Sequence, residues 1–161
     1  MKKESESERD LAGLVERGGV LYDVGGTTPR EVLAAITGAL PSRICADRDG
    51  LLKAVLEREE LMSTGISGGI ALPHPRSPMA GENEQFVTIA FPSFPVDWKA
   101  LDGGEVTSVL LIVSSSAKLH LHTLSKINFL CRLEKFTALL RGRAPAGEII
   151  AAIREAERDW K

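Results

Sequence analysis

Residues 63–75 have the sequence STGISGGIALPHP, which divides into a turn and a short apolar run. The first part, Ser63–Gly69, contains Ser, Thr and three glycines, a composition typical of a tight connection. The second part begins with Ile70–Leu72, which has the composition of a short strand, and it stops at Pro73-His74-Pro75. Two flanking prolines restrict the backbone, so we expect the His74 side chain to be held at the end of a structural element.

Two helices are expected on the N-terminal side of this stretch. Thr28-Pro29-Arg30-Glu31 supplies an N-cap, a proline at the first helical position and the acid of a capping box. Apolar residues then recur at helical spacing until Pro41. A second helix is expected to follow Asp47 or Asp49 and to end near residues 60–62.

Two strands and two further helices are expected on the C-terminal side. Phe86–Phe91 and Val106–Val113 are β-branched or aromatic runs of strand length, bounded by turn residues. Apolar residues at three- and four-residue steps predict a helix between Lys118 and Phe136, and 146–160 supports another. The packed face of the first of these helices is predicted to contain Leu121, Leu124, Ile127, Leu130 and Cys131. This order predicts an α/β fold with a small mixed sheet flanked by helices.

Length and composition predict one folded domain. The chain has 161 residues, of which 43% are apolar, enough for one sizeable core. Residues 1–17 mix Lys, Glu, Ser and Arg with few apolar positions. We therefore expect a flexible charged arm or linker over 1–17 and one domain over 18–161.

Charge and cysteine usage narrow the class of protein. Twenty basic and twenty-two acidic residues nearly balance, which gives no reason to expect a nucleic-acid partner. No stretch approaches the ~20 apolar residues that cross a bilayer, so direct membrane insertion is not expected. Cys45 and Cys131 match neither a metal pair nor a redox motif, which favours free thiols in the cytoplasm.

Three histidines are the candidates for chemistry. His74 could carry a reactive group, or it could simply cap a strand or bond a nearby carbonyl. His120 and His122 could suggest zinc. A step of two residues on a helix turns the side-chain direction by roughly 200°, however, so the two cannot both point at one ion. His120 borders the expected packed face, and His122 is expected to be solvated. The chain also lacks the P-loop that would hold nucleotide phosphates, so direct use of ATP is not expected.

Three spaced segments resemble one family. Residues 58–74 have the sequence REELMSTGISGGIALPH, residues 96–103 have VDWKALDG, and residues 120–124 have HLHTL. Together they resemble the fructose, mannitol and nitrogen-regulatory enzyme IIA domains of the phosphotransferase system. The resemblance covers roughly residues 19–157, and it implies the mannitol/fructose-type enzyme IIA fold.

The resemblance implies a role for each matching residue. His74 matches the histidine that accepts a phosphoryl group, on the ring nitrogen farther from the main chain. His120 matches a second active-centre histidine, and Arg58 matches an arginine that stabilises the phosphoryl group. Arg58 could instead be a helix-end charge paired with a carboxylate such as Glu57.

Three further residues are candidate phosphate-binding groups. Ser63 and Thr64 match polar residues close to the family's site. Arg76 could supply a charge beside it. Members of the family usually have Gly or another small residue after the active histidine, whereas this chain has Pro75-Arg76. Pro75 has no backbone N–H, which puts the identity of the donor in question.

The resemblance implies a phosphotransferase component that uses no metal or nucleotide cofactor. The donor that the resemblance implies is phosphorylated HPr or a nitrogen-branch relative. No metal or nucleotide is needed, because the phosphohistidine of such a donor already carries an activated phosphoryl group. A protein donor also requires an apolar docking surface, for which the candidates are Ile66, Ile70, Leu72 and Met79, or else these residues are core. The chain could act as a nitrogen-type regulator, as a sugar-transport domain that passes phosphate to a IIB domain, or as a binding module. A regulator would act on a kinase, a channel or a transcription factor.

Overall fold

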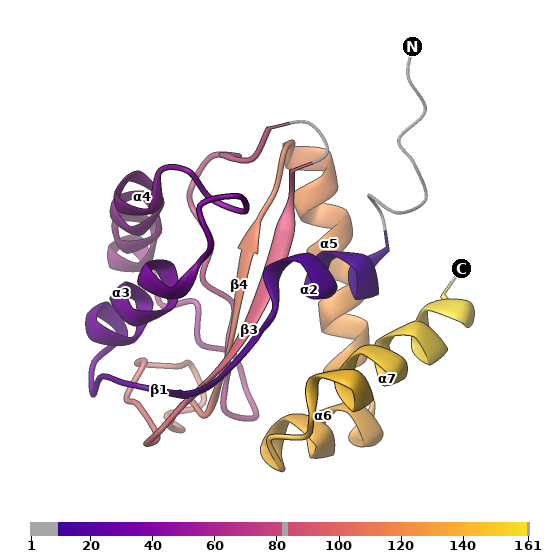
Figure 1. Cartoon of the computed structure of the whole chain (residues 1–161). Coiled ribbons are helices and arrows are strands. Elements are labelled where there is room, and N and C mark those ends of the chain that lie inside the picture. Colours follow the sequence, from indigo (N-terminus) through magenta and orange to yellow (C-terminus); the bar gives the residue numbers. More distant parts are fainter. Residues whose placement is uncertain (1–9, 82–83, 161) are drawn as a thin grey trace.

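The computed structural model describes residues 10–81 and 84–160, and its centre is a four-stranded mixed sheet (Figure 1). The strand order is β1-β3-β4-β2. The inner pair β3 and β4 is antiparallel, whereas β1 runs parallel to β3 and β2 parallel to β4. The strands are β1 (Val20–Val24), β2 (Ile70–Ala71), β3 (Phe86–Pro92) and β4 (Ser108–Val113). The predicted α/β fold with a small mixed sheet is therefore confirmed.

Helices cover both faces of the sheet. Figure 1 shows α3 and α4 on one side of the sheet and α5, α6 and α7 on the other. The two faces form separate cores, and alternate residues of β4 enter them: Leu110 and Ile112 face one core and Leu111 faces the other. The helices are α2 (Leu11–Gly18), α3 (Pro29–Ala39), α4 (Arg48–Leu61), α5 (Ala117–Leu130), α6 (Glu134–Arg141) and α7 (Ala146–Arg158).

The start signals of α3 and α4 act as predicted. The Thr28 hydroxyl accepts the Glu31 backbone N–H at 3.2 Å. The Asp47 carboxylate accepts the Gly50 backbone N–H at 2.9 Å. Because these bonds are local, the sequence pattern could identify both helix starts.

The expected arm is wrong over the part of it that the structure describes, because residues 11–17 belong to the packed helix α2. Leu11, Leu14 and Val15 are buried against the sheet and α7. Glu157 of α7 accepts the backbone N–H groups of Leu11 at 3.0 Å and Ala12 at 2.9 Å. The local N-cap Asp10 also accepts the Ala12 N–H, at 3.1 Å, and only the second acceptor, 145 residues away, could not be found from the local sequence. Residues 1–9 lie outside the described residues.

Three other elements differ from the expectation. The strand β1 was not predicted, because its five residues carry no strong alternation. The helix expected between Lys118 and Phe136 is two helices, since α5 ends at Leu130 and α6 begins at Glu134. Backbone bonds from Cys131 to Ile127 and from Leu133 to Leu130 form the turn between them.

The face of α5 was also partly mispredicted. Leu121 is 64% exposed rather than packed, and the buried face instead contains Thr123 and Lys126. Lys126 is accommodated because its ammonium group pairs with Glu157 at 2.5 Å. His122, expected to be solvated, is partly buried, and its Nε2 atom is shielded from solvent.

Among the described residues, no helix has the length and apolar character that a membrane span requires.

Candidate functional site

Two parallel strands bring His74 and His120 together. The chain leaves β2 at Ala71 and stays beside β4, because the Pro73 carbonyl accepts the Ile112 N–H at 3.0 Å. The helix α5 starts just after β4, with His120 in its first turn. Since β2 and β4 are parallel, both segments emerge at the same edge of the sheet. The two imidazole ring centroids lie 4.6 Å apart, with 46° between the ring planes.

A tight turn delivers His74 to this edge. The Leu72 N–H donates to the Thr64 carbonyl at 3.0 Å, and the Ile66 N–H donates to the Ile70 carbonyl at 2.7 Å. Gly68 and Gly69 complete the reversal at φ angles of 81° and 78°, where a side chain would be strained. The turn predicted before the apolar run is therefore confirmed.

A hydrogen bond fixes the proton position on His74. Its Nδ1 atom lies 2.8 Å from the Leu72 carbonyl oxygen. A carbonyl can only accept, so Nδ1 carries the proton and the Nε2 lone pair is left available. The sequence left open whether His74 carries a reactive group or only bonds a nearby carbonyl. In the structure its Nδ1 bonds a carbonyl, and its Nε2 lone pair is still available.

Both imidazoles are held neutral at physiological pH. Burial lowers the pKa of His74, opposed by its bond to Leu72, and the Arg58 charge lowers it further. Burial also lowers the pKa of His120 to about 4, with the neighbouring His74 and Arg58 acting in the same direction. A nitrogen nucleophile must be unprotonated, so the environment favours the reactive form of His74.

Arg58 is the cation of the site. It lies in the last turn of α4, where its Nη1 donates to the Met62 carbonyl at 2.8 Å. Its charge lowers the pKa of both histidines, so it lies within electrostatic range of the two rings. The alternative was an ion pair with a carboxylate such as Glu57, and no such pair forms among residues 10–81 and 84–160.

The hydroxyls of Ser63 and Thr64 hold the loop. Ser63 Oγ donates to the Trp98 carbonyl at 2.5 Å, and Thr64 Oγ1 donates to Glu59 Oε2 at 2.6 Å. Glu59 was not among the predicted site residues, although it stands beside Arg58 in the family-like stretch. Its neighbour Arg58 and its place just before the turn were the only signals that could have identified it.

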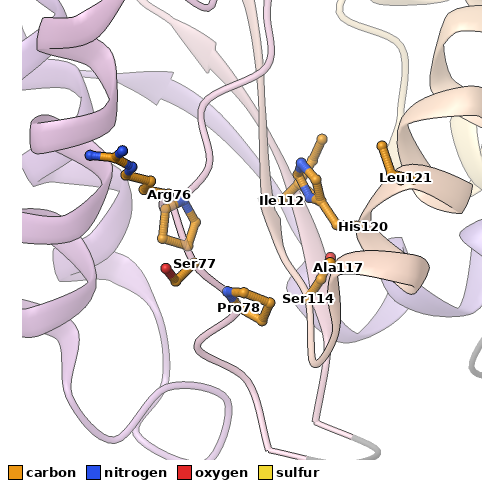
Figure 2. Close-up of a pocket in the computed structure, with 9 residues that line it drawn as sticks. Arg76, Ser77, Pro78, Ile112, Ser114, Ala117, His120 and Leu121 are labelled. Carbon is orange, nitrogen blue, oxygen red and sulfur yellow. The ribbon is translucent and has the colours of Figure 1, made fainter.

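A cavity of about 220 Å³ lies next to His120 (Figure 2). Its walls are the segment Pro75–Pro78, the end of β4 and the first turn of α5. Arg76 contributes to the wall, but Figure 2 shows its guanidinium extending away from His120. Arg76 is exposed, so its charge is available at the rim rather than inside the site.

The apolar candidates for a docking surface separate into two groups. Ile70 and Leu72 are core residues, 3% and 5% exposed, and Ile66 packs partly against the same core. Met79 is 43% exposed and remains a candidate. Leu121, beside His120, is a second exposed apolar residue that the sequence pattern assigned to the core.

The described residues offer no other reactive cluster. Within 10–81 and 84–160, no group of three or more His, Cys, Asp or Glu residues could hold a metal ion. Cys45 and Cys131 are unpaired, and burial raises the pKa of both thiols, that of Cys131 to about 11. Such thiols are poor nucleophiles.

Sequence comparison identifies relatives of two kinds. The family described as phosphoenolpyruvate-dependent sugar phosphotransferase system, EIIA 2, matches residues 14–156. A nitrogen regulatory protein of Pseudomonas aeruginosa is 31% identical over 120 residues, covering 73% of this chain and 77% of that protein. A fructose-like EIIA component of Escherichia coli is 39% identical over 70 residues, covering 44% of this chain but only 46% of that protein.

Solved structures share the fold. The nitrogen regulatory protein IIA-Ntr from Neisseria meningitidis superimposes with a TM-score of 0.73 at 22% identity, covering 84% of this chain and 93% of that one. The enzyme IIAMTL of Escherichia coli, solved in complex with phosphorylated enzyme IIBMTL, gives 0.66 at 14% identity, covering 86% and 95%. With the family match over most of the chain, these findings show that the protein belongs to the EIIA type 2 family of the phosphoenolpyruvate-dependent sugar phosphotransferase system.

Proposed function

We propose that His74 accepts a phosphoryl group on Nε2 from a phosphohistidine of an HPr-type carrier protein. The observation that supports this most directly is the bond between His74 Nδ1 and the Leu72 carbonyl, which leaves the Nε2 lone pair free. In the reaction the Nε2–P bond forms as the donor's N–P bond breaks. The bonding electron pair returns to the donor imidazole nitrogen.

Two neighbouring groups would stabilise the transferred phosphoryl group. Arg58 supplies a positive charge that acts on both rings, and this charge would balance the negative phosphoryl oxygens during transfer. His120 is neutral because burial lowers its pKa to about 4, so it can donate one N–H to a phosphoryl oxygen. In this proposal Ser63 and Thr64 position the loop, and Arg76 acts at the rim.

The test is phosphorylation by a purified phosphorylated HPr protein or its nitrogen-branch counterpart. We expect an acid-labile, base-stable adduct by intact-mass spectrometry, and we expect His74→Ala to lose it. His122→Ala, which removes a different histidine of the same chain, should keep the adduct. An unchanged mass of the wild-type protein with both donors would overturn the proposal.

We further infer a regulatory role of the nitrogen type. The similarity to a nitrogen regulatory protein extends over 77% of that protein's length, whereas the similarity to the fructose-like EIIA component spans under half of its length. A regulator would change its binding to a kinase, channel or transcription factor with its phosphorylation state. Adding a sugar-specific IIB domain to the phosphorylated protein separates the roles, because rapid loss of phosphate to IIB would favour transport instead.

A further inference from the structure

Glu59 uses both of its carboxylate oxygens on a single residue. Oε1 accepts the Thr64 backbone N–H at 2.9 Å, and Oε2 accepts the Thr64 hydroxyl at 2.6 Å. Thr64 is 6% exposed, so water has little access to these bonds. The last turn of α4 is thereby fixed to the start of the turn that leads into β2.

The chain of hydrogen bonds continues from Thr64 to His74. The Thr64 carbonyl accepts the Leu72 N–H at 3.0 Å, and the Leu72 carbonyl accepts the Nδ1 proton of His74 at 2.8 Å. The N–H and the C=O of each of these residues belong to different peptide groups, so the bonds act by holding Thr64 and Leu72 in place.

We propose that Glu59 is a positioning residue, which fixes the tautomer and ring orientation of His74 through Thr64 and Leu72. Glu59 holds Thr64, the Thr64 carbonyl holds the Leu72 N–H, and the Leu72 carbonyl is thereby kept in place to accept the Nδ1 proton. A carboxylate that orients an imidazole through its second nitrogen is a common arrangement in functional histidines. Here two residues, Thr64 and Leu72, stand between them.

This proposal rests on the proposed function and extends it to the phosphorylated state. Forming the Nε2–P bond while Nδ1 keeps its proton leaves a positive charge on the ring. The charged and titratable groups that act on His74 and its partner ring are Arg58 and Glu59 of α4 and His120 of α5. Glu59 is the acid among them, and its charge raises the pKa of His74, opposing Arg58. It would therefore stabilise the cationic phosphorylated ring.

The decisive experiment is ¹⁵N NMR of the histidine rings in the unphosphorylated protein. We expect wild-type His74 to be almost entirely the Nδ1–H tautomer. In Glu59→Gln we expect a larger share of the Nε2–H tautomer and a His74 pKa that falls further. Glu57→Gln, an exposed change on the same helix, is the matched control and should leave the His74 signals unchanged. Unchanged tautomer and titration in a folded Glu59→Gln protein would overturn the proposal.

Thr64 provides a second, milder test. Thr64→Val removes the hydroxyl bond to Glu59, whereas Thr64→Ser keeps it, so only the first should alter the His74 tautomer. Phosphoryl transfer to Glu59→Gln should be roughly tenfold slower than to the wild type, as for other residues that orient a reactive group. The NMR result does not depend on any phosphoryl donor. If the wild-type protein is never phosphorylated, the proposed function is wrong. The NMR measurement of the His74 tautomer would still test the proposed role of Glu59.

Discussion

Acidification should weaken the fold through His120. In the unfolded chain this imidazole takes up a proton near its ordinary pKa of 6.5, whereas in the folded protein burial holds the pKa at about 4. Between these values the unfolded state binds more protons, so stability decreases as the pH falls. The contribution is complete above pH 6.5 and is lost progressively toward pH 4.

The size of the effect follows from the two pKa values. The interval from 6.5 to about 4 corresponds to a ceiling of about 3 kcal/mol, at about 1.4 kcal/mol for each pH unit. His120 is only partly buried, so solvent screening reduces this ceiling. We expect the unfolding free energy to lose about 1 to 2 kcal/mol through His120 between pH 7.5 and 4.5.

Asp10 acts in the opposite direction in the same pH range. Burial and the neighbouring Glu157 raise its pKa from 3.8 to about 6, so protonation of Asp10 favours the folded state as the pH falls from 6 toward 4. The wild-type curve alone therefore combines both effects with that of His74, whose pKa burial also lowers. Comparison with His120→Asn isolates His120, because Asp10 and His74 are present in both proteins.

The assay is urea unfolding followed by circular dichroism at pH 7.5 and pH 4.5. His120→Asn should lose about 1 to 2 kcal/mol less than the wild type over this interval. Lys118→Ala, an exposed change on the same helix, should lose as much as the wild type. Equal losses in the wild type and His120→Asn would refute the assignment of a depressed pKa to His120.

Two further predictions concern the site and the core. Arg58→Gln removes the cation beside the rings, so the pKa of both His74 and His120 should rise; an unchanged NMR titration would contradict this. Gly18→Ala places a Cβ 2.0 Å from the backbone carbonyl oxygen of Val87. Backbone atoms of a strand cannot move aside as easily as the end of a flexible side chain. We expect a loss of about 3 kcal/mol in urea unfolding, whereas Gly147→Ala, with open space around it, should be neutral or stabilising.

Local signals made part of the fold predictable. The helices α3 and α4 start at side-chain caps within three residues, and β3 and β4 are long apolar runs. The elements that were missed depend on distant partners. Residues 11–18 form a helix that Asp10 caps locally, but Glu157 supplies further acceptors and the sheet covers the apolar face of the helix.

The sequence named candidate residues for the site, but it did not show how they are arranged. Resemblance to a family identified His74, His120 and Arg58 as candidates, and the parallel pairing of β2 and β4 explains why two of them meet. The tautomer of His74 depends on a carbonyl two residues away, and the role of Glu59 depends on the fold of the turn. Neither is encoded in spacing alone.

The sequence departure at Pro75-Arg76 has a physical consequence for any phosphoryl group on His74. Pro75 is buried and has no N–H, so the residue after the histidine offers no main-chain donor to the phosphoryl oxygens. Side-chain donors then carry more of the stabilisation, and the candidates are His120, whose ring lies 4.6 Å from that of His74, and Arg58, whose charge acts on the His74 ring. The ability of a side chain to donate a hydrogen bond depends on its charge and protonation state, whereas a peptide N–H is always a donor. We therefore expect transfer to this protein to be sensitive to pH and to the charge of the donor surface.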